Sequence, residues 1–369
     1  MVGQHMPHMS KAQATVLALW SFGMVIAQSS GLTSVTRVIA ELTKQKESNV
    51  RQRLREWNRD RADKAGDKRQ ELAVESCFVP LLKWVLEWWP TEEKRIILAM
   101  DATSLRDCFV VLAISVVYRG CAIPIAWCVT ASGQKRAWKG EWLGLFARFE
   151  QVLGAEWQVL VMADRGLYGP WLFQAIQKLH WHPFLRINAN GKYCLPGSSQ
   201  FFPMQQLISG VGAEWSGVVT CFKSKPVRGS LLIRWGAGYT DPLLIMTDLP
   251  LEQAHIAWYG MRAWIECSFR QTKRAGWRWH QTRMTDPARA ARHWLAMAVA
   301  TLWVVSVGGQ VDLAQPPASI LPFLPILRPR HRPRLLSCFR QGLLSILVAL
   351  IDHRPLPFGR FCAPYDLVT

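Results

Sequence analysis

The sequence predicts a mixed α/β protein, in which a small helical unit precedes a sheet that carries a β-rich insertion. Three observations predict this class. Residues 1–94 have helical patterning, apolar runs with strand character begin at Arg95, and residues 189–248 combine Gly, Ser and Pro with short strand-like runs. Short apolar runs bounded by turn residues are typical of buried strands.

The helical unit, residues 1–94, contains a basic stretch. Between Lys44 and Arg69 there are ten Lys or Arg residues against five Asp or Glu residues. Two interpretations stay open. The stretch is either a DNA-binding helix-turn-helix whose second helix is Ser48–Trp57, or a solvated surface helix with no partner.

The core of the sheet is expected to begin with three antiparallel strands and to continue with alternating helices and strands. Strands are predicted at Arg95–Asp101, Phe109–Tyr118, Ala122–Val129, Gln158–Met162 and Pro183–Ile187, and helices at Gly140–Leu153 and Trp171–Leu179. This order predicts a mixed sheet. We assign the core to residues 95–188 and 249–314, on either side of the insertion at 189–248.

The second half of the chain changes character twice. After the insertion, helices are predicted at Leu251–Lys273 and Pro287–Val307, the latter strongly apolar. Residues 315–369 form a Pro-rich basic tail, which is either a disordered extension or an arm that contacts phosphates. The arginines interleaved with its prolines are Arg328, Arg330, Arg332, Arg334 and Arg340.

Composition narrows the class of partner. The chain has 369 residues with 44 Lys or Arg and 26 Asp or Glu, a net charge of +18, and half of its residues are hydrophobic. With 19 Trp and 15 Phe it can build a large core, which excludes a disordered basic polypeptide. The charge favours nucleic acid, then an anionic membrane surface, over a basic protein with neither partner.

The apolar segments and the cysteines indicate the cellular compartment of the protein. None of the nine Cys residues forms a Cys-x-x-Cys pair, as expected in a reducing compartment. Thr15–Ala27 and Trp294–Gly309 are apolar, but they are short for a membrane span and are expected to be buried helices. We therefore expect a soluble cytoplasmic protein that does not bind a membrane.

Two aspartates fall where predicted strands end. Asp101 closes the first strand, and Asp164 follows the fourth, just before Gly166. The two carboxylates would converge if their strands were neighbours in the sheet. The alternative is that each is an ordinary turn-forming or capping Asp.

A third carboxylate lies on the helix after the insertion, with three other functional side chains. They are Tyr259, Arg262, Glu266 and Lys273. Their spacing places them along one helical face, where a phenol, a guanidinium and an ammonium surround one acid. The face is either an anion-binding surface or an exposed surface with an Arg–Glu pair.

Two Asp and one Glu are suitable ligands for Mg²⁺ or Mn²⁺, which prefer oxygen. In a two-metal phosphodiester site, one ion activates the attacking oxygen and the other stabilises the leaving oxygen. Asp101, Asp164 and Glu266 would then hold two ions, and Arg262 and Lys273 would bind phosphates.

These residues resemble those of the DDE transposases of bacterial insertion sequences. The resemblance is to the insertion-sequence-four-like group, whose signature is Y-(2)-R-(3)-E-(6)-K. All four positions and all three gaps are matched by Tyr259, Arg262, Glu266 and Lys273. The sequences M-D-A-T-S around Asp101 and A-D-R-G-L-Y around Asp164 follow the same family pattern. The resemblance covers roughly residues 95–310.

The resemblance implies a ribonuclease H-like core and a helical DNA-binding region at residues 1–94. Asp101, Asp164 and Glu266 would be the catalytic metal ligands, Tyr259 and Arg262 would contact phosphates of the transposon end, and Lys273 a nearby phosphate. The reaction would be hydrolytic nicking and then strand transfer by the 3′-OH, with a hairpin intermediate as one route. Double-stranded DNA and a homodimeric synaptic complex would be the partners.

In that family a Trp from the β-rich insertion stacks on a flipped base. Trp215 and Trp235 are the candidates here, and Trp235 is our assignment, although with 19 Trp in the chain a place in the core is the stronger expectation for either residue.

Two other functions remain open. One is a structure-selective DNA nuclease on the same core, which the absence of terminal inverted repeats beside the reading frame would favour. The other is a DNA-binding protein with a repurposed core. A membrane-associated basic protein is a more distant alternative.

Overall fold

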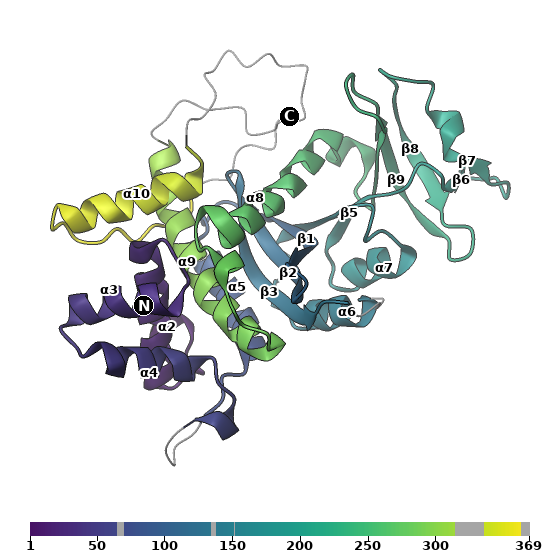
Figure 1. Ribbon diagram of the computed structural model, residues 1–369. Coiled ribbons are helices and arrows are strands. Elements are labelled where there is room, and N and C mark those ends of the chain that lie inside the picture. The colour runs from purple at the N-terminus through teal and green to yellow at the C-terminus, as the bar shows by residue number, and fades with distance from the viewer. Residues whose placement is uncertain (65–69, 134–137, 151, 314–335, 363–369) are drawn as a thin grey trace.

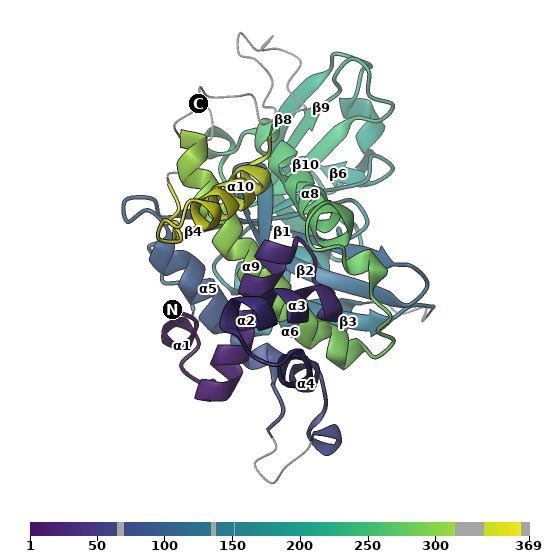
Figure 2. The ribbon, with the colours of Figure 1, turned by 60° about the vertical axis from the view of Figure 1, so that its left-hand side comes forward.

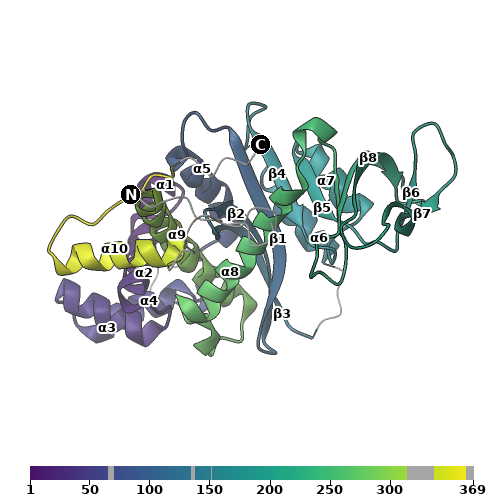
Figure 3. The same cartoon turned by 90° about the horizontal axis from the view of Figure 1, so that it is seen from above.

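The structure is a computed structural model, which describes residues 1–64, 70–133, 138–150, 152–313 and 336–362. One ten-stranded sheet runs through it in the order β3-β2-β1-β4-β5-β10-β9-β8-β6-β7, with helices packed against it. Figures 1 and 3 show the helical N-terminal unit and the pair β6–β7 at opposite ends of the molecule. The chain is therefore a mixed α/β protein, as the sequence predicts.

The first five strands form the half of the sheet that carries the aspartates. They are β1 (Arg95–Leu105), β2 (Phe109–Tyr118), β3 (Cys121–Ala131), β4 (Gln158–Ala163) and β5 (His182–Arg186). β2 and β3 form an antiparallel meander with β1, while β4 lies parallel to β1 and β5 parallel to β4. Buried β-branched and apolar residues on both sides of β1, β2 and β4 explain why these strands lie at the centre.

One strand boundary differs from the prediction. β1 does not end at Asp101 but continues to Leu105, because Asp101 and the residues after it pair with β2, where Asp101 lies opposite Ala113. On its other side β1 pairs with β4 only as far as Met100 and Ala163. Asp101 is therefore the first residue beyond the parallel pairing, and it still lies at that edge.

The predicted insertion is part of the same sheet. Its strands are β6 (Lys192–Cys194), β7 (Phe202–Pro203), β8 (Glu214–Cys221), β9 (Val227–Arg234) and β10 (Leu243–Thr247). β10 pairs antiparallel with β5, so that backbone hydrogen bonds extend from the core into residues 189–248. Figure 2 shows this half of the sheet above the core, far from the N-terminal helices.

The predicted helices of the core are shorter or less regular than expected. α6 (Lys139–Ala147) ends well before Leu153, while α7 (Pro170–Lys178) nearly matches its prediction. The expected single helix Leu251–Lys273 is wrong in detail. After a short 3₁₀ turn at Leu251–Gln253, it consists of a 3₁₀ helix, Ile256–Ala263, then α8, Trp264–Arg270, and a π turn, Gln271–Ala275.

The N-terminal unit is helical, as predicted. Its α-helices are α1 (Val2–His5), α2 (Lys11–Ala27), α3 (Leu32–Thr43), α4 (Glu47–Trp57) and α5 (Phe78–Trp88), with 3₁₀ turns at Arg61–Asp63 and Val74–Cys77. A capping box of Ser10 and Gln13 begins α2. The buried Ser21 hydroxyl donates to Ala296 O (3.1 Å), which fixes α2 against the long core helix α9.

The apolar helix near the C-terminus is α9 (Pro287–Leu313). Among the described residues, α9 is long and apolar enough to cross a membrane, as is the sharply bent pair α2–α3 taken together. However, 89% of the most apolar stretch of α9 is buried inside the protein. Packing in the core thus accounts for its apolarity. It also accounts for much of the Trp content, since the fully buried side chains include Trp20, Trp84, Trp142, Trp277, Trp279 and Trp294.

The expectation of a basic tail at 315–369 needs correction. Cys338–Ile351 forms a helix, α10, that packs on α9, and the contact is so close that a Cβ at Gly342 would lie 1.9 Å from Val304 O. Arg340, expected in a phosphate-contacting arm, belongs to α10 and donates to Gln28 Oε1 (3.0 Å). The other arginines of the predicted arm lie outside the described residues: Arg328, Arg330, Arg332 and Arg334.

Candidate active site

Asp101 and Asp164 lie side by side at one edge of the sheet. Their strands, β1 and β4, are parallel neighbours, and the last paired residues, Met100 and Ala163, immediately precede the two aspartates. The two strands are therefore neighbours, which is the condition under which the sequence predicts that the two carboxylates converge. Asp101 is mostly buried and its Oδ1 accepts from the N–H of Ala102 (2.8 Å), while Asp164 is about one-third exposed.

Arg262 connects two of the three predicted carboxylates. Its Nη2 lies 2.7 Å from Asp101 Oδ2, and its Nη1 donates to Glu266 Oε1 one helical turn further along the chain. The guanidinium is buried, with 11% of the side chain exposed. A cation is thus held directly between the acids of β1 and α8.

Tyr259 attaches the same segment to β4. Its hydroxyl lies 3.3 Å from both Ala163 O and Asp164 Oδ1. In a 3₁₀ helix, residues three apart lie above one another, so Tyr259 and Arg262 face the sheet edge together. The 3₁₀ geometry therefore keeps the phenol and the guanidinium on one side, which a regular α-helix would do less well.

These side chains surround a cavity of about 300 Å³. Its lining residues that carry polar or charged side chains are Asp164, Arg186, Arg234, Tyr239, Asp241, Tyr259, Arg262 and Glu266. Half of the Glu266 side chain is exposed to solvent. The cavity lies between the core of the sheet and the segment after β9, both of which contribute lining residues.

Burial and charge shift the pKa values of this cluster. Burial raises the pKa of Asp101, and the neighbouring charge of Arg262 opposes the rise. Burial by itself lowers the pKa of Arg262, but the charge of Asp101 and the other acids outweighs it, so the net shift is upward. Burial also raises the pKa of Tyr259, and the charge of Asp164 adds to the rise. Arg262 therefore stays charged and Tyr259 stays a hydrogen-bond donor at neutral pH.

Two predicted site residues lie apart from the cavity. Lys273 is in the π turn after α8 and does not line the cavity. Burial and the charge of Arg274 lower the pKa of this amine, and the charge of Asp101 offsets only part of the shift. The indole N–H of Trp235 donates to Tyr239 O (2.9 Å), while its neighbours Arg234 and Gly236 line the cavity. The aromatic ring that does line it from this loop is Tyr239, 41% exposed.

Arg186 is a site residue that the sequence did not reveal. It is the last residue of β5, and its Nη1 lies 3.7 Å from Asp164 Oδ1. Arg234, at the end of β9, faces the same cavity and pairs with Glu214 Oε1 through Nε (3.0 Å). A signal for Arg186 was present, since it lies near the end of the predicted strand Pro183–Ile187, the next strand along the chain after the one that precedes Asp164.

The donor chemistry fits a hard divalent cation, but the geometry is not that of a closed metal site. Among the described residues, no group of three or more His, Cys, Asp or Glu side chains is close enough to hold a metal ion. Asp101 and Glu266 are instead joined through the guanidinium of Arg262. The guanidinium of Arg262 lies between these two carboxylates, whose oxygens are the ligand type that Mg²⁺ and Mn²⁺ prefer.

Comparison with known proteins gives one family match. The family described as "Transposase DDE domain" matches residues 144–303, which include Asp164, Glu266 and the segment between them. The cryo-EM structure of a piggyBac transposase synaptic complex with hairpin DNA is similar at 8% identity, with a TM-score of 0.44, over 94% of this chain and 74% of that chain. A search of curated proteins gives no match. The domain match supports a metal-dependent DNA-cutting enzyme of the DDE transposase type.

Proposed function

We propose that this protein is a DNA transposase of the insertion-sequence-four-like group, which cuts phosphodiester bonds at transposon ends and joins the freed 3′-OH to target DNA. The observation that carries the proposal is the placement of Asp101 and Asp164 on parallel neighbouring strands, with Arg262 binding both Asp101 and Glu266. The match to a transposase DDE domain over residues 144–303 supports it.

The sheet supports a ribonuclease H-like core in this proposal. β3, β2 and β1 form an antiparallel meander, and β4 and β5 continue the sheet parallel to β1. The strands from β10 to β7 would then be the β-rich insertion between the second Asp and the Glu. Residues 1–94 would be the DNA-binding region.

Asp101, Asp164 and Glu266 would hold two Mg²⁺ or Mn²⁺ ions. When bound, the metal would activate the attacking oxygen and stabilise the leaving oxygen of the phosphodiester. The side chains of the protein supply the rest. Arg262 neutralises the acids at the sheet edge. Because a guanidinium binds carboxylate and phosphate oxygens in the same forked geometry, Arg262 would exchange a carboxylate for a phosphate oxygen when DNA binds.

The cations and phenol around the cavity would bind the DNA backbone. Tyr259 and Arg262 are the proposed contacts to phosphates of the transposon end, Arg186 adds a third beside Asp164, and Lys273 would contact a phosphate outside the cavity. A role for Trp235 in base stacking remains a prediction, as does a hairpin intermediate. A homodimeric synaptic complex on double-stranded DNA, in the bacterial cytoplasm, completes the proposal.

The test is cleavage of DNA by full-length carboxylate variants. The probe is a duplex that carries the DNA flanking the reading frame on both sides, incubated with Mg²⁺. Asp101→Asn, Asp164→Asn and Glu266→Gln should each abolish cleavage while end binding, measured in Ca²⁺ by gel shift, stays within a few-fold of wild type.

Asp241→Asn is the matched control. Asp241 lines the same cavity but pairs with Arg165 (3.1 Å) and is not one of the three proposed ligands, so this variant should still cut. Robust cleavage by any of the three ligand variants would overturn the metal-site assignment. Cleavage of branched DNA without regard to the flanking sequence would favour the structure-selective nuclease instead.

A further inference from the structure

We propose that the side chains which bind DNA phosphates also control access to the metal ligands. The carboxylates would bind divalent cations tightly only after the DNA backbone has taken these side chains away from them. The inference rests on the proposed transposase function and adds regulation to its metal site. Arg262 is the main residue of this control, and Tyr259 and Arg186 have smaller parts.

Arg262 lies where a metal ion would have to bind between two of the proposed ligands. Its Nη2 lies 2.7 Å from Asp101 Oδ2, and its Nη1 donates to Glu266 Oε1. A dication between the same two carboxylates would lie beside the guanidinium, and like charges in contact repel strongly in a poorly solvated site. Arg262 and a metal ion therefore compete for Asp101 and Glu266.

The third ligand, Asp164, is held by two weaker contacts. The Tyr259 hydroxyl lies 3.3 Å from Asp164 Oδ1, and Arg186 Nη1 lies 3.7 Å from the same oxygen. Both distances are longer than that from Arg262 to Asp101, so these contacts should oppose metal binding less. Each of the three carboxylates thus has a donor from this chain, and the donors are the proposed phosphate contacts.

The guanidinium of Arg262 has a donor that the carboxylates do not use. In the part of the chain that the structure describes, its buried Nε–H has no hydrogen-bond partner. Such a group costs free energy, because buried donors are normally paired. A phosphate offers several acceptor oxygens in the forked geometry that a guanidinium prefers, and it could therefore satisfy more of these donors.

The exposure of the two acids determines how this exchange ends. Glu266 is 55% exposed, so its carboxylate regains water when the guanidinium leaves. Asp101 is only 20% exposed, and the loss of Arg262 leaves there a charge that a metal ion would compensate. Phosphate and metal thus favour the same arrangement of Arg262. Because such coupling is reciprocal, each should raise the affinity of the protein for the other.

This coupling would restrict where the protein cuts. The metal site would be completed only on DNA whose phosphates reach the cavity beside Asp164 and Arg262. DNA that touches the protein elsewhere would leave the carboxylates in their ion pairs, and the protein would bind metal weakly and not cut.

The first test measures Mn²⁺ binding to the full-length protein without DNA, by electron paramagnetic resonance of the free ion. Arg262→Ala should bind Mn²⁺ about tenfold more tightly than wild type, a coupling of ordinary size. Tyr259→Phe removes only the hydroxyl beside Asp164, so its gain should be about threefold, as for the loss of one hydrogen bond. An unchanged melting temperature verifies that each variant is folded.

Arg234→Ala is the matched control. Arg234 lines the same cavity, and its loss also removes one positive charge, but its ion pair is with Glu214 on β8. A charge that is not in contact with a ligand acts through solvent and counter-ions, so Mn²⁺ affinity should stay within about twofold of wild type. An equal gain in Arg234→Ala and Arg262→Ala would show that only net charge matters and would overturn the inference.

The second test measures the coupling itself. The probe is the duplex that carries the flanking DNA, and its dissociation constant is measured by fluorescence anisotropy in EDTA and in Ca²⁺. The gain in affinity from Ca²⁺ should be about tenfold larger for wild type than for Arg262→Ala, because only wild type has an arginine to displace. A metal ion that simply bridged phosphate and carboxylate would give both proteins the same gain.

Two results would overturn the inference while the proposed function stands, provided that wild type still cuts the flanking duplex in Mg²⁺. One is equal Mn²⁺ affinity in wild type, Arg262→Ala and Tyr259→Phe. The other is an equal gain from Ca²⁺ in wild type and Arg262→Ala. A wild type that does not bind or cut the flanking duplex would instead overturn the proposed function, and the Mn²⁺ affinities measured without DNA would still decide whether Arg262 competes with metal.

Discussion

The two basic regions of the molecule use arginine in opposite ways. At the sheet edge, Arg262 is buried and paired with Asp101 and Glu266, whereas Arg53 and Arg55 of α4 are exposed to solvent. A buried pair fixes geometry, since removing one partner leaves an uncompensated charge in a poorly solvated site. An exposed cation does little to fix the geometry of its surroundings. It attracts a polyanion over a distance that decreases as the salt concentration rises. The sheet edge thus holds its arginine in a fixed position, whereas α4 presents its arginines to solvent.

The largest effect is expected from Arg262→Ala. The change leaves Asp101 buried without its partner and removes a proposed phosphate contact, so cleavage should fall by more than about 100-fold, as for loss of a transition-state contact. Arg53→Ala should weaken DNA binding while single-turnover cleavage of bound DNA stays near the wild-type rate. Quench-flow cleavage assays at saturating protein separate the two outcomes.

Arg262→Ala also tests whether Arg262 contacts a phosphate. Arg262→Ala should lower the salt dependence of binding by about one unit of slope. A slope equal to that of wild type would show that Arg262 does not contact a phosphate, and the contrast between the two regions would then lie only in folding and geometry.

A second prediction concerns the link between the regions. Arg292→Leu removes the buried cation that binds Asp60 and Glu71, which are themselves partly exposed and can regain water. We therefore expect a loss of about 2 to 3 kcal/mol in the free energy of unfolding, somewhat less than for a fully buried pair. Urea denaturation measures it, and hydrogen exchange should rise in residues 44–63.

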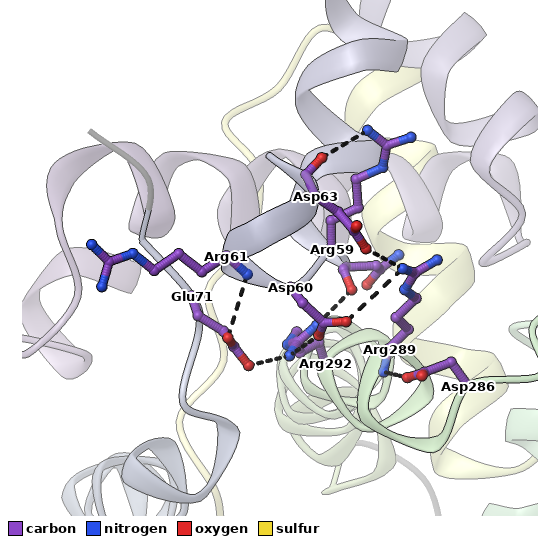
Figure 4. A network of polar contacts seen from close by, with 9 residues as sticks. Arg59, Asp60, Arg61, Asp63, Glu71, Asp286, Arg289 and Arg292 are labelled. Carbon is purple, nitrogen blue, oxygen red and sulfur yellow. Dashed lines mark hydrogen bonds and ion pairs between the residues drawn. The ribbon is translucent and has the colours of Figure 1, made fainter. Parts of the chain in front are cut away.

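The control for this change is Arg354→Leu. Arg354 pairs with Asp352 on the surface (2.9 Å), and exposed pairs contribute less than about 1 kcal/mol. If Arg292→Leu were as mild as this control, the polar network of Figure 4 would not hold α4 to the core.

The smallest effect involves His293, next to Arg292 on α9. Burial lowers the pKa of His293 from 6.5 to about 4. The unfolded chain therefore binds more protons than the folded one between these values, and stability falls as the pH drops from 6.5 toward 4. By linkage, the contribution of His293 makes the free energy of unfolding about 2 kcal/mol lower at pH 5 than at pH 7.

His293→Gln should abolish this part of the pH dependence, because Gln does not titrate. The measurement is urea denaturation of wild type and variant at pH 7 and pH 5, with the difference between the two pH values compared. An equal difference in both proteins would mean that His293 is not the group responsible.

Several features could be predicted from the sequence because they depend on local patterns. Buried strands such as Phe109–Tyr118 were predicted within a residue or two, since a continuous apolar run has few other solutions. The positions of Asp101 and Asp164 at the edge followed from the runs that precede them. The helical N-terminal unit followed from periodicity and capping residues.

Other features were wrong or invisible because they depend on contacts between distant segments. Residues 189–248 join the core sheet through β10 and β5, and no local pattern indicates which strand will be the neighbour of another. The helix expected at Leu251–Lys273 changes its hydrogen-bond spacing twice, where Tyr259 and Arg262 bond to the sheet edge. Here tertiary bonds outweigh the weak helix propensity.

By itself, the sequence determined the chemistry available to this protein: an excess of cations, three well-spaced carboxylates, and one face with a phenol and a guanidinium. Only the tertiary structure decided how these groups act on one another. It paired β1 with β4, brought Arg186 to Asp164, and placed Arg262 between Asp101 and Glu266. The physical reason is that strand order and burial set distances and solvation, and electrostatic energies depend on both.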